Sequence, residues 1–171
     1  MRWVFQEPDK KLVEKLQSEF DTSSAIAVTM ANRGIISKES SREFFEPTLD
    51  QLHDPFMMKN MDQAVGRIMT NIRSGQPIMV FGDYDVDGTT AASILYLSLT
   101  DFGGVVNTYI PHREHEGYGL SKKGIDFAAE QNINLIITCD CGINAVEKVA
   151  YARDINIDVI ITYHHIPDNR L

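Results

Sequence analysis

The stretch from residue 78 to residue 88 reads Ile78-Met79-Val80-Phe81-Gly82-Asp83-Tyr84-Asp85-Val86-Asp87-Gly88. Its first four residues form an unbroken apolar run, and acidic residues alternate with other types directly after it. A short apolar run without polar alternation is typical of a strand that is buried on both faces of a sheet. The stretch therefore predicts a central strand that runs straight into a polar, acidic loop.

Similar apolar runs recur further along the chain. We expect strands at residues 105–110, 135–138 and 159–162, with helices at about 90–101, 121–130 and 144–153 between and around them, and a helix at 60–75 before the first strand. Uninterrupted strands that alternate with helices predict an α/β fold, a parallel sheet with flanking helices and right-handed crossovers. Asn60 with Gln63, and Asn144 with Glu147, are the expected helix caps.

The first part of the chain has a different pattern. Residues 10–20 are amphipathic, a second helical run follows Ser24 and ends at Gly34, and Ser37 is placed to cap a third run before Pro47. None of these segments has a convincing strand signal. We therefore predict a helical N-terminal extension at residues 1–59 and an α/β catalytic domain, incomplete at its C-terminus, at residues 60–171.

The composition and the apolar segments disfavour a membrane protein, a secreted protein and a generic nucleic-acid binder. The 171 residues are 43% hydrophobic and 23% charged, which is ordinary for a globular domain. No apolar run approaches the roughly 20 residues of a membrane span, the N-terminus has no apolar signal region, and Cys139 and Cys141 are too close for a disulfide. These features predict a cytoplasmic protein without membrane contact. The net charge of -8 disfavours a generic nucleic-acid binder, unless the acids hold cations.

Chemically active residues follow every predicted strand. They are Asp83, Asp85 and Asp87 after the first, His112, Arg113, Glu114, His115 and Glu116 after the second, Asp140 after the third, and Tyr163, His164 and His165 after the fourth. Four of the five histidines lie in these loops. Because the carboxyl ends of parallel strands meet at one edge of a sheet, where ligands bind in such folds, we expect these side chains to converge.

Other interpretations of the acidic run are weaker or stay open. A calcium-binding EF-hand loop would need a glutamate where Ile94 stands, and a phosphate-binding loop would need a lysine after Gly88. An acidic turn that only caps the following helix remains an alternative. Arg113 is suited to clamping a phosphate, and its alternative is a salt bridge to Glu114 or Glu116.

The combination of carboxylates with one or two imidazoles indicates the metal. Such donors favour manganese or magnesium over zinc. Two such ions about 3.5 to 4 Å apart form the clamp that is used in phosphoester hydrolysis. Mutual repulsion among so many carboxylates at one sheet edge also favours a site that is filled by cations.

The segments that follow the predicted strands resemble the motifs of a known family. Four segments resemble, in order, the motifs of the DHH phosphoesterase superfamily: Asp83–Gly88, Arg113 with Glu116–Leu120, Asp140–Gly142, and His164–His165. The segment Leu52–Phe56 and the helix after it resemble the region before the first motif. The resemblance covers nearly the whole chain.

The resemblance implies a 5′-to-3′ exonuclease that acts on single-stranded DNA in repair and recombination, and that depends on two Mn²⁺ or Mg²⁺ ions. Single-strand-binding protein and helicases are the partners that it implies. Its motifs assign Asp85, Asp87, Asp140 and His164 as metal ligands, Asp83 as a ligand or a supporting acid, and Asp140 as the bridge between the ions. Arg113 and His165 would contact the scissile phosphate.

Two features depart from the superfamily pattern. Tyr163 stands where the namesake Asp-His-His triplet begins, and a phenol carries no charge near neutral pH. The sequence also ends at Leu171, before the further aspartate and the additional domains that the superfamily implies, so the fragment alone is expected to be inactive. Two alternatives follow: a phosphodiesterase for short oligonucleotides or cyclic dinucleotides, and a non-catalytic binding module.

Overall fold

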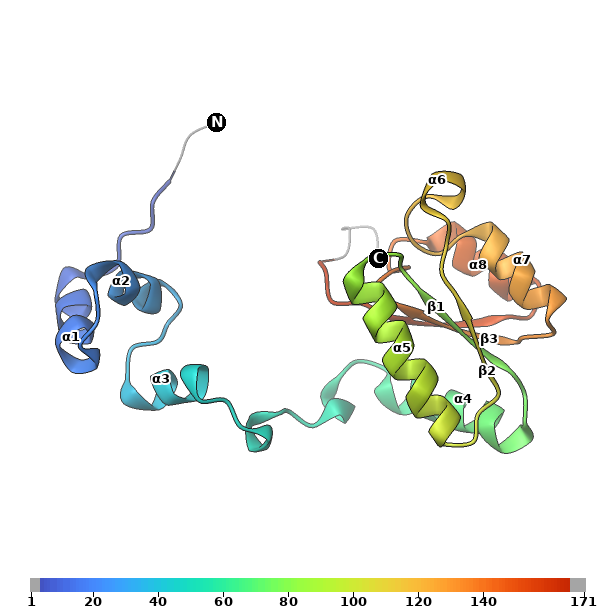
Figure 1. Cartoon of the computed structure of the whole chain (residues 1–171), viewed down its shortest axis with the longest axis horizontal. Helices are drawn as coiled ribbons and strands as arrows, with labels where there is room; N and C mark the ends of the chain where they lie inside the picture. Colours follow the sequence, from blue (N-terminus) through green and yellow to red (C-terminus); the bar gives the residue numbers. More distant parts are fainter. Residues whose placement is uncertain (1–3, 167–171) are drawn as a thin grey trace. The chain divides into compact units, whose positions relative to one another are not determined.

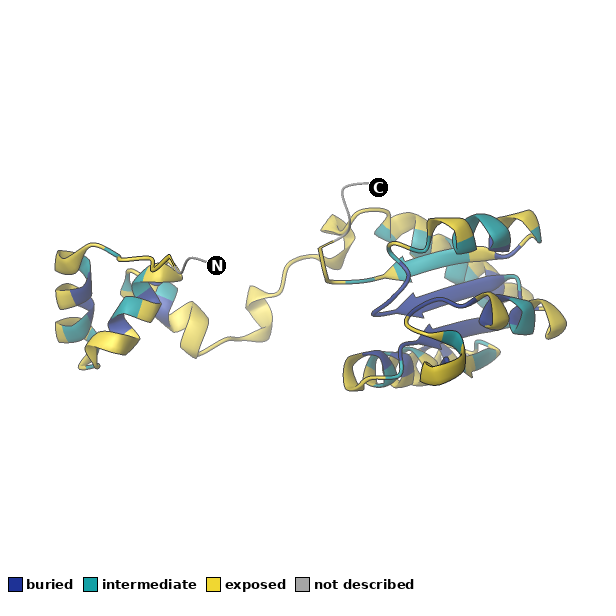
Figure 2. Cartoon of the chain, turned by 90° about the horizontal axis from the view of Figure 1, so that it is seen from above, coloured by how far each residue is buried: buried dark blue, intermediate teal, exposed yellow. Residues whose placement is uncertain are grey.

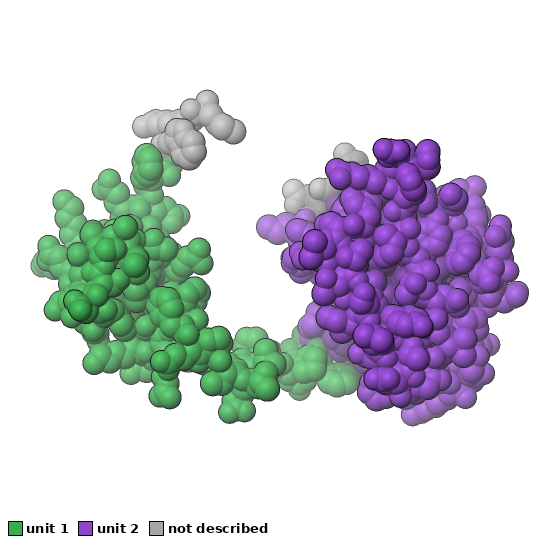
Figure 3. All heavy atoms as spheres, in the orientation of Figure 1, with its two compact units in different colours: residues 1–57 green, residues 58–171 purple. Residues whose placement is uncertain are grey.

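The computed structural model describes residues 4–166 and divides the chain into two compact units, residues 1–57 and 58–171 (Figures 1 and 3). Residues 1–3 and 167–171 lie outside the described part, and so does the C-terminal end of the predicted α/β domain. The two units are considered separately.

In its described residues, 4–57, the first unit consists of three short helices and two helical turns. They are α1 (Lys10–Phe20), α2 (Ser24–Asn32), α3 (Lys38–Phe45), η1 (Leu49–Gln51) and η2 (Pro55–Met57). A small core of Val13, Leu16, Ala27, Met30 and Ile35 joins α1 to α2. The Ser37 side chain accepts a hydrogen bond from the Ser40 backbone and caps α3, as the sequence predicts.

The second unit contains the sheet. Its elements are α4 (Met61–Ser74), β1 (Ile78–Gly82), α5 (Val86–Asp101), β2 (Val106–Tyr109), α6 (Arg113–Glu116), α7 (Lys122–Glu130), β3 (Leu135–Cys139), α8 (Val146–Asp154) and β4 (Asp158–Thr162). The four strands are parallel in the order β2-β1-β3-β4. The predicted α/β fold is confirmed.

Both faces of the sheet are covered by helices, and the central strands are fully buried (Figures 1 and 2). Alternate residues of β1 point to opposite faces. Met79 and Phe81 pack in the cluster that includes residues of α7 and α8, while Ile78 and Val80 pack with residues of α5 and α4. The strand register pairs Gly82 with Cys139, and Cys139 with Thr162, so the loops after β1, β3 and β4 begin at one edge.

Some helices begin at other residues than the sequence pattern predicts. Helix α5 begins at Val86 rather than near residue 90, because the Asp85 carboxylate accepts a hydrogen bond of 2.9 Å from the Gly88 N–H and caps it. Of the two predicted asparagine caps, Asn60 holds the cap position of α4 without the capping hydrogen bond, and Asn144 is not at the cap position of α8. Asn60 has a left-handed backbone and makes no side-chain cap, and α8 begins at Val146 with Ala145 at the cap position. The short helix α6 was not expected.

Within residues 4–166, no helix has both the length and the apolar character that a bilayer crossing requires.

Candidate metal and phosphate site

The loop after β1 places its three aspartates in different environments. The Asp83 side chain is fully buried, Asp85 caps α5, and Asp87 is exposed in the first turn of that helix. Gly88 makes this geometry possible, because a Cβ atom there would lie 2.6 Å from the Cβ of Asp83. The helix thus starts directly against Asp83, and only glycine fits at the contact.

Asp83 is buried without a partner for its charge. Neither carboxylate oxygen has a hydrogen-bond partner among the described residues. Burial raises the pKa of Asp83, and the charges of Asp85 and Asp140 raise it further. The backbone N–H of Tyr84 and the Arg113 guanidinium oppose this shift of the pKa. The net result is that the protein stabilises the ionised form of Asp83 less well than water does.

The loop after β3 holds Asp140 in a constrained conformation. Its backbone is left-handed, with φ of 56°, and its N–H donates a hydrogen bond of 3.0 Å to the Thr162 carbonyl at the end of β4. The Thr138 hydroxyl fixes the same loop by donating to the Cys141 carbonyl at 2.8 Å. Asp140 is only 8% exposed. A left-handed aspartate that several contacts fix is typical of a functional position.

Two imidazoles from the loop after β4 meet the Asp140 carboxylate. The Nε2 atoms of His164 and His165 lie 3.1 and 3.4 Å from its Oδ1 atom. Neither contact has hydrogen-bond geometry, so this buried oxygen lacks a hydrogen-bond partner among the described residues. One ligand atom of each of the three side chains lies within 4.8 Å of the others. The three residues therefore converge as a set of possible cation ligands.

Arg113 lies over the aromatic ring of Tyr84, with its guanidinium carbon 5.2 Å from the ring centre. The Tyr84 ring in turn packs edge-on against the ring of Tyr118, with the two ring centres 6.5 Å apart. A guanidinium that stacks on a ring keeps its N–H groups free to face an anion. Its charge also acts on the buried carboxylate of Asp83. In this position the Arg113 guanidinium is suited to hold a phosphate, and it is equally suited to offset the negative charge of the loop after β1.

The turn that carries Arg113 is fixed by Glu116. The Glu116 carboxylate accepts hydrogen bonds from the backbone N–H of His112, the hydroxyl of Tyr109 and the hydroxyl of Ser121, at 2.9, 2.8 and 2.6 Å. Burial alone would raise the pKa of Glu116, but these three hydrogen bonds lower it below the usual range. The salt bridge between Arg113 and Glu116 that the sequence left open is absent from the described residues.

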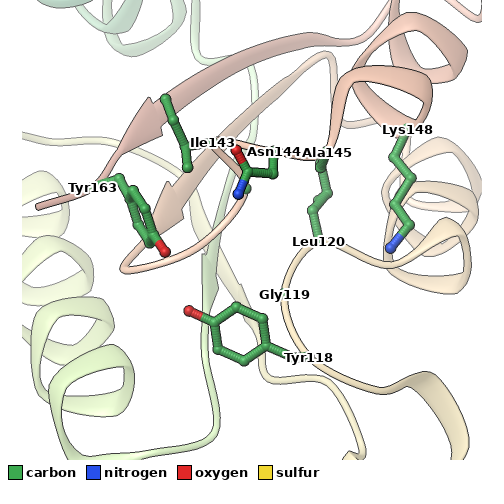
Figure 4. A pocket seen from close by; sticks show the side chains of 9 residues that line it. Tyr118, Gly119, Leu120, Ile143, Asn144, Ala145, Lys148 and Tyr163 are labelled. Atoms are coloured by element: carbon green, nitrogen blue, oxygen red, sulfur yellow. The ribbon is translucent and has the colours of Figure 1, made fainter. Parts of the chain in front are cut away.

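A pocket of about 200 Å³ adjoins the Asp140 loop. It is lined by Tyr118, Gly119, Leu120, Gly142, Ile143, Asn144, Ala145, Lys148 and Tyr163, and Figure 4 shows the two tyrosine hydroxyls directed into the space between the rings. The Tyr118 hydroxyl donates to the Asp140 carbonyl at 3.1 Å. Burial, a hydrogen bond to Tyr163 and the nearby aspartates raise the pKa of Tyr118, so this hydroxyl remains a neutral donor at neutral pH.

The donor chemistry of this edge fits hard divalent ions. Buried carboxylate oxygens of Asp83 and Asp140 have no hydrogen-bond partner among the described residues, and two imidazoles stand beside one of them. Oxygen donors with a few imidazoles suit manganese and magnesium. The carboxylates of Asp83, Asp85 and Asp87 are not part of the compact group around Asp140 in the described residues. The structure thus brings together one half of the predicted ligand set.

Sequence reasoning overlooked three parts of this site. The ring of Tyr84 supports Arg113, the hydroxyl of Tyr118 fixes the Asp140 loop, and the carboxylate of Glu116 fixes α6. For Tyr84 the sequence does contain a signal. A tyrosine between alternating aspartates after a strand must lie at the same edge of the sheet as those aspartates. The contact between Tyr118 and Asp140 joins residues 22 positions apart, which no local pattern reveals.

Comparison with known proteins identifies the family. The N-terminal domain of the DHH family matches residues 77–171, which is more than half of the sequence and includes all four strand-end loops. The chain belongs to the DHH family. This match extends from the first residue before β1 to the end of the chain, so it includes the whole sheet.

Curated relatives of this DHH chain are bacterial exonucleases. It is 38% identical over 171 residues to the single-stranded-DNA-specific exonuclease RecJ of Bacillus subtilis, covering 100% of the chain and 22% of that protein. It is 30% identical over 168 residues to RecJ of Thermus thermophilus, covering 98% of the chain and 24% of that protein. The chain therefore spans about a quarter or less of the length of these relatives.

Solved structures share the fold. RecJ from Thermus thermophilus in complex with Mn²⁺ has a TM-score of 0.68 at 26% identity, over 96% of this chain and 22% of that one. An exonuclease RecJ bound to manganese has a TM-score of 0.58 at 36% identity, over 66% of this chain and 29% of that one. A third structure is the Thermus protein in complex with Mg²⁺, with a TM-score of 0.55 at 25% identity, over 94% of this chain and 19% of that one.

Proposed function

We propose that this chain supplies the N-terminal catalytic part of a metal-dependent 5′-to-3′ exonuclease for single-stranded DNA. The observation that carries the proposal is the meeting of Asp140 with His164 and His165 at the sheet edge, beside the buried and unpaired Asp83. Membership of the DHH family and the similarity to RecJ proteins support the reaction class. Residues 1–59 would form a helical extension, and residues 60–171 the incomplete catalytic domain.

The proposed metal ligands are Asp85, Asp87, Asp140 and His164, with Asp83 as a further ligand or a supporting acid. Asp140 is the candidate bridge, because it lies in the loop between the other two sets in the sheet order. When bound, two Mn²⁺ or Mg²⁺ ions would supply Lewis-acid activation of the phosphodiester and of the attacking water. The unpaired carboxylate oxygens are the feature of the chain that fits such ions.

The remaining residues would orient the substrate. Arg113, supported by the ring of Tyr84, would hold the phosphoryl oxygens and offset the charge that develops on them. His165 would contact the same phosphate from the opposite loop. The Tyr118 hydroxyl, kept protonated by its raised pKa, fixes the Asp140 loop through its hydrogen bond to the carbonyl.

The biological setting is also a proposal. Repair and recombination, a cytoplasmic location, and single-strand-binding protein and helicases as partners follow from the family resemblance. The acidic balance of the chain, with a net charge of -8, indicates that this part of the protein would hold DNA through the ions and Arg113.

The test is hydrolysis of labelled single strands by the intact protein. Oligonucleotides of several lengths, labelled at either end, are incubated with Mn²⁺ or Mg²⁺ and compared with duplex DNA and a cyclic dinucleotide. The proposal requires mononucleotides released from the 5′ end of long single strands. Hydrolysis restricted to dinucleotides or cyclic dinucleotides would instead favour the phosphodiesterase alternative. Binding without hydrolysis at saturating metal would favour the non-catalytic module.

A further inference from the structure

The turn α6 carries ligating side chains that the proposed hydrolysis does not use. His112, Glu114 and His115 surround Arg113 in the sequence, and all three side chains are exposed. One ligand atom from each of the three lies within 4.8 Å of the other two. In the described residues, the only other group of this kind is that of Asp140 with the two histidines of the loop after β4.

The two imidazoles of this group are already close. Their ring centres lie 4.4 Å apart, and their planes differ by 22°. The two rings are stacked, and because the nitrogen lone pairs lie in the ring planes, a rotation of the exposed side chains is needed to bring both nitrogens to one ion. Because the three side chains are exposed, an ion can reach them from solvent and keep water as a further ligand.

The backbone of this turn is held in place before any ion binds. Glu116 accepts the N–H of His112 at 2.9 Å, and it is itself fixed by the hydroxyls of Tyr109 and Ser121. The carbonyl of His112 also accepts the N–H groups of His115 and Glu116, at 3.1 and 2.9 Å. A turn with these contacts loses little backbone freedom when its side chains bind an ion, which favours affinity.

The donor set selects a class of metal. Two imidazole nitrogens and one carboxylate oxygen suit zinc and its neighbours in the first transition row, and three protein ligands with an open position are a common zinc arrangement. The Asp140 group also offers two imidazoles and one carboxylate, but it differs in the additional unpaired carboxylate oxygens of the buried Asp83 nearby. Two sites of different preference would thus lie on the loops that follow β2 and β3–β4.

We propose that His112, Glu114 and His115 bind a zinc-class divalent ion at a site separate from the manganese or magnesium site. Arg113 lies between two of these ligands in the chain, so an ion there would restrict the turn that presents the guanidinium. The site thereby offers a way for zinc to alter the presentation of the phosphate clamp. The proposal stands whether or not the chain hydrolyses DNA, because it concerns metal binding alone.

The test is calorimetric titration of the intact protein with Zn²⁺, and with Co²⁺ as a probe whose visible absorption reports its ligands. Both titrations are made in an Asp140→Ala background, which removes the other candidate group. We expect about one equivalent to bind. His112→Ala and His115→Ala should each weaken zinc binding more than tenfold, since even loss of a residue that merely orients a ligand costs about 10- to 100-fold.

A control variant, a third ligand variant and a check of folding keep the result decisive. His53→Ala removes an exposed histidine from the other unit and should leave zinc binding unchanged. Glu114→Gln retains the size of the side chain and should also weaken binding, and thermal melting of each metal-free variant checks that it folds. Unchanged zinc affinity in His112→Ala and His115→Ala, or equal losses in His53→Ala, would overturn the proposal. Loss of the cobalt absorption in the α6 variants alone would support it.

Discussion

Glu116 and Asp83 are two acidic residues near the same edge of the sheet, and the protein treats them in opposite ways. Glu116 accepts three hydrogen bonds, and its pKa lies below the usual range. Asp83 is completely buried, has no hydrogen-bond partner for either oxygen among the described residues, and has a raised pKa. Burial costs a carboxylate free energy in both cases, but only Glu116 recovers that cost from neighbouring donors.

The difference separates carboxylates that support the fold from carboxylates that await a ligand. Glu116 joins β2, α6 and the start of α7 through its hydrogen bonds, which is a structural role. Asp83, and the Oδ1 atom of Asp140, have no donor among the described residues that would justify their burial. A divalent cation would supply the missing stabilisation, which is why we propose these two residues for the metal site rather than for the scaffold.

The largest effect is expected from Asp140→Ala. The comparison predicts that this carboxylate acts through bound ions, whose contribution to phosphoester hydrolysis is several kcal/mol, so turnover by the intact protein should fall about 100- to 1000-fold or more. The metal-free fold should persist with little net change in stability, because the loss of a like charge near Asp83 is offset by the strain of alanine in the left-handed backbone of position 140. Steady-state hydrolysis at saturating Mn²⁺ and thermal melting without metal measure the two effects.

Asp126→Asn is the matched control. Asp126 is a partly buried carboxylate of α7 that accepts a hydrogen bond of 2.6 Å from the Tyr151 hydroxyl, so it resembles Glu116 in being satisfied. This variant should hydrolyse DNA normally and melt at a lower temperature. Normal turnover in Asp140→Ala would remove Asp140 from the chemistry and break the distinction between the two kinds of carboxylate.

Tyr163→Asp should have a smaller effect. It should strengthen Mn²⁺ binding and hydrolysis but lower the stability of the metal-free protein. The Tyr163 ring lies 5.1 Å from that of His165 and 6.5 Å from that of His164. A carboxylate there would orient the imidazoles and attract cations, which predicts about tenfold tighter Mn²⁺ binding and faster hydrolysis. Without metal it adds charge beside Asp140 and removes the contact with Tyr118, so the melting temperature should fall.

Tyr163→Asn separates charge from size in this test. It shortens the side chain equally but adds no charge, so it should lower the metal-free stability without improving Mn²⁺ affinity. Calorimetric titration of the parent protein and of both variants gives the comparison. If the parent and the Tyr163→Asp variant bind Mn²⁺ with equal affinity, position 163 tolerates either residue and a carboxylate there has no role in holding the ions.

The sheet could be predicted from the sequence because its central strands are uninterrupted apolar runs, which suit only full burial. The convergence of polar loops followed from the common direction of the strands. The details of the site depend on contacts between distant residues, such as the Tyr118 hydroxyl with the Asp140 carbonyl. They also depend on the Asp85 carboxylate, which is a proposed metal ligand but accepts a hydrogen bond from the Gly88 N–H. The sequence pattern left open that the acidic run caps the following helix, and the Asp85 carboxylate does so, which moves the start of α5 from near residue 90 to Val86.

Asp85 therefore provides a test with a modest effect on stability. Asp85→Ala removes the cap and should lower the free energy of unfolding by about 1 kcal/mol, the usual cost of losing a helix cap. Asp85→Asn keeps a capping oxygen and should change stability by much less, while it removes the negative charge of a proposed metal ligand. Denaturant unfolding without metal and Mn²⁺ titration distinguish the roles. Normal Mn²⁺ affinity in Asp85→Asn would leave Asp85 with the capping role alone.

The smallest effect tests the difference between Asp83 and Glu116 most directly, and it concerns pH in the absence of metal. Asp83 has a raised pKa in the folded state, so the folded protein keeps a proton that the unfolded chain loses above about pH 4. Stability therefore falls as the pH rises from the unfolded-state pKa through the folded-state value. Asp83→Asn should remove that loss and melt at a higher temperature than the parent at neutral pH.

Glu116 should show the reverse dependence in the same experiment. Its pKa is lowered in the folded state, so its contribution to stability is present above the ordinary glutamate range and is lost as the pH falls through the folded-state value. Glu116→Gln should therefore lose most stability relative to the parent at neutral pH and approach it in acid. Melting curves of the parent, Asp83→Asn and Glu116→Gln, recorded in chelator from pH 3 to pH 7, are expected to diverge in opposite directions. Parallel curves for the two variants would show that the protein treats both carboxylates alike.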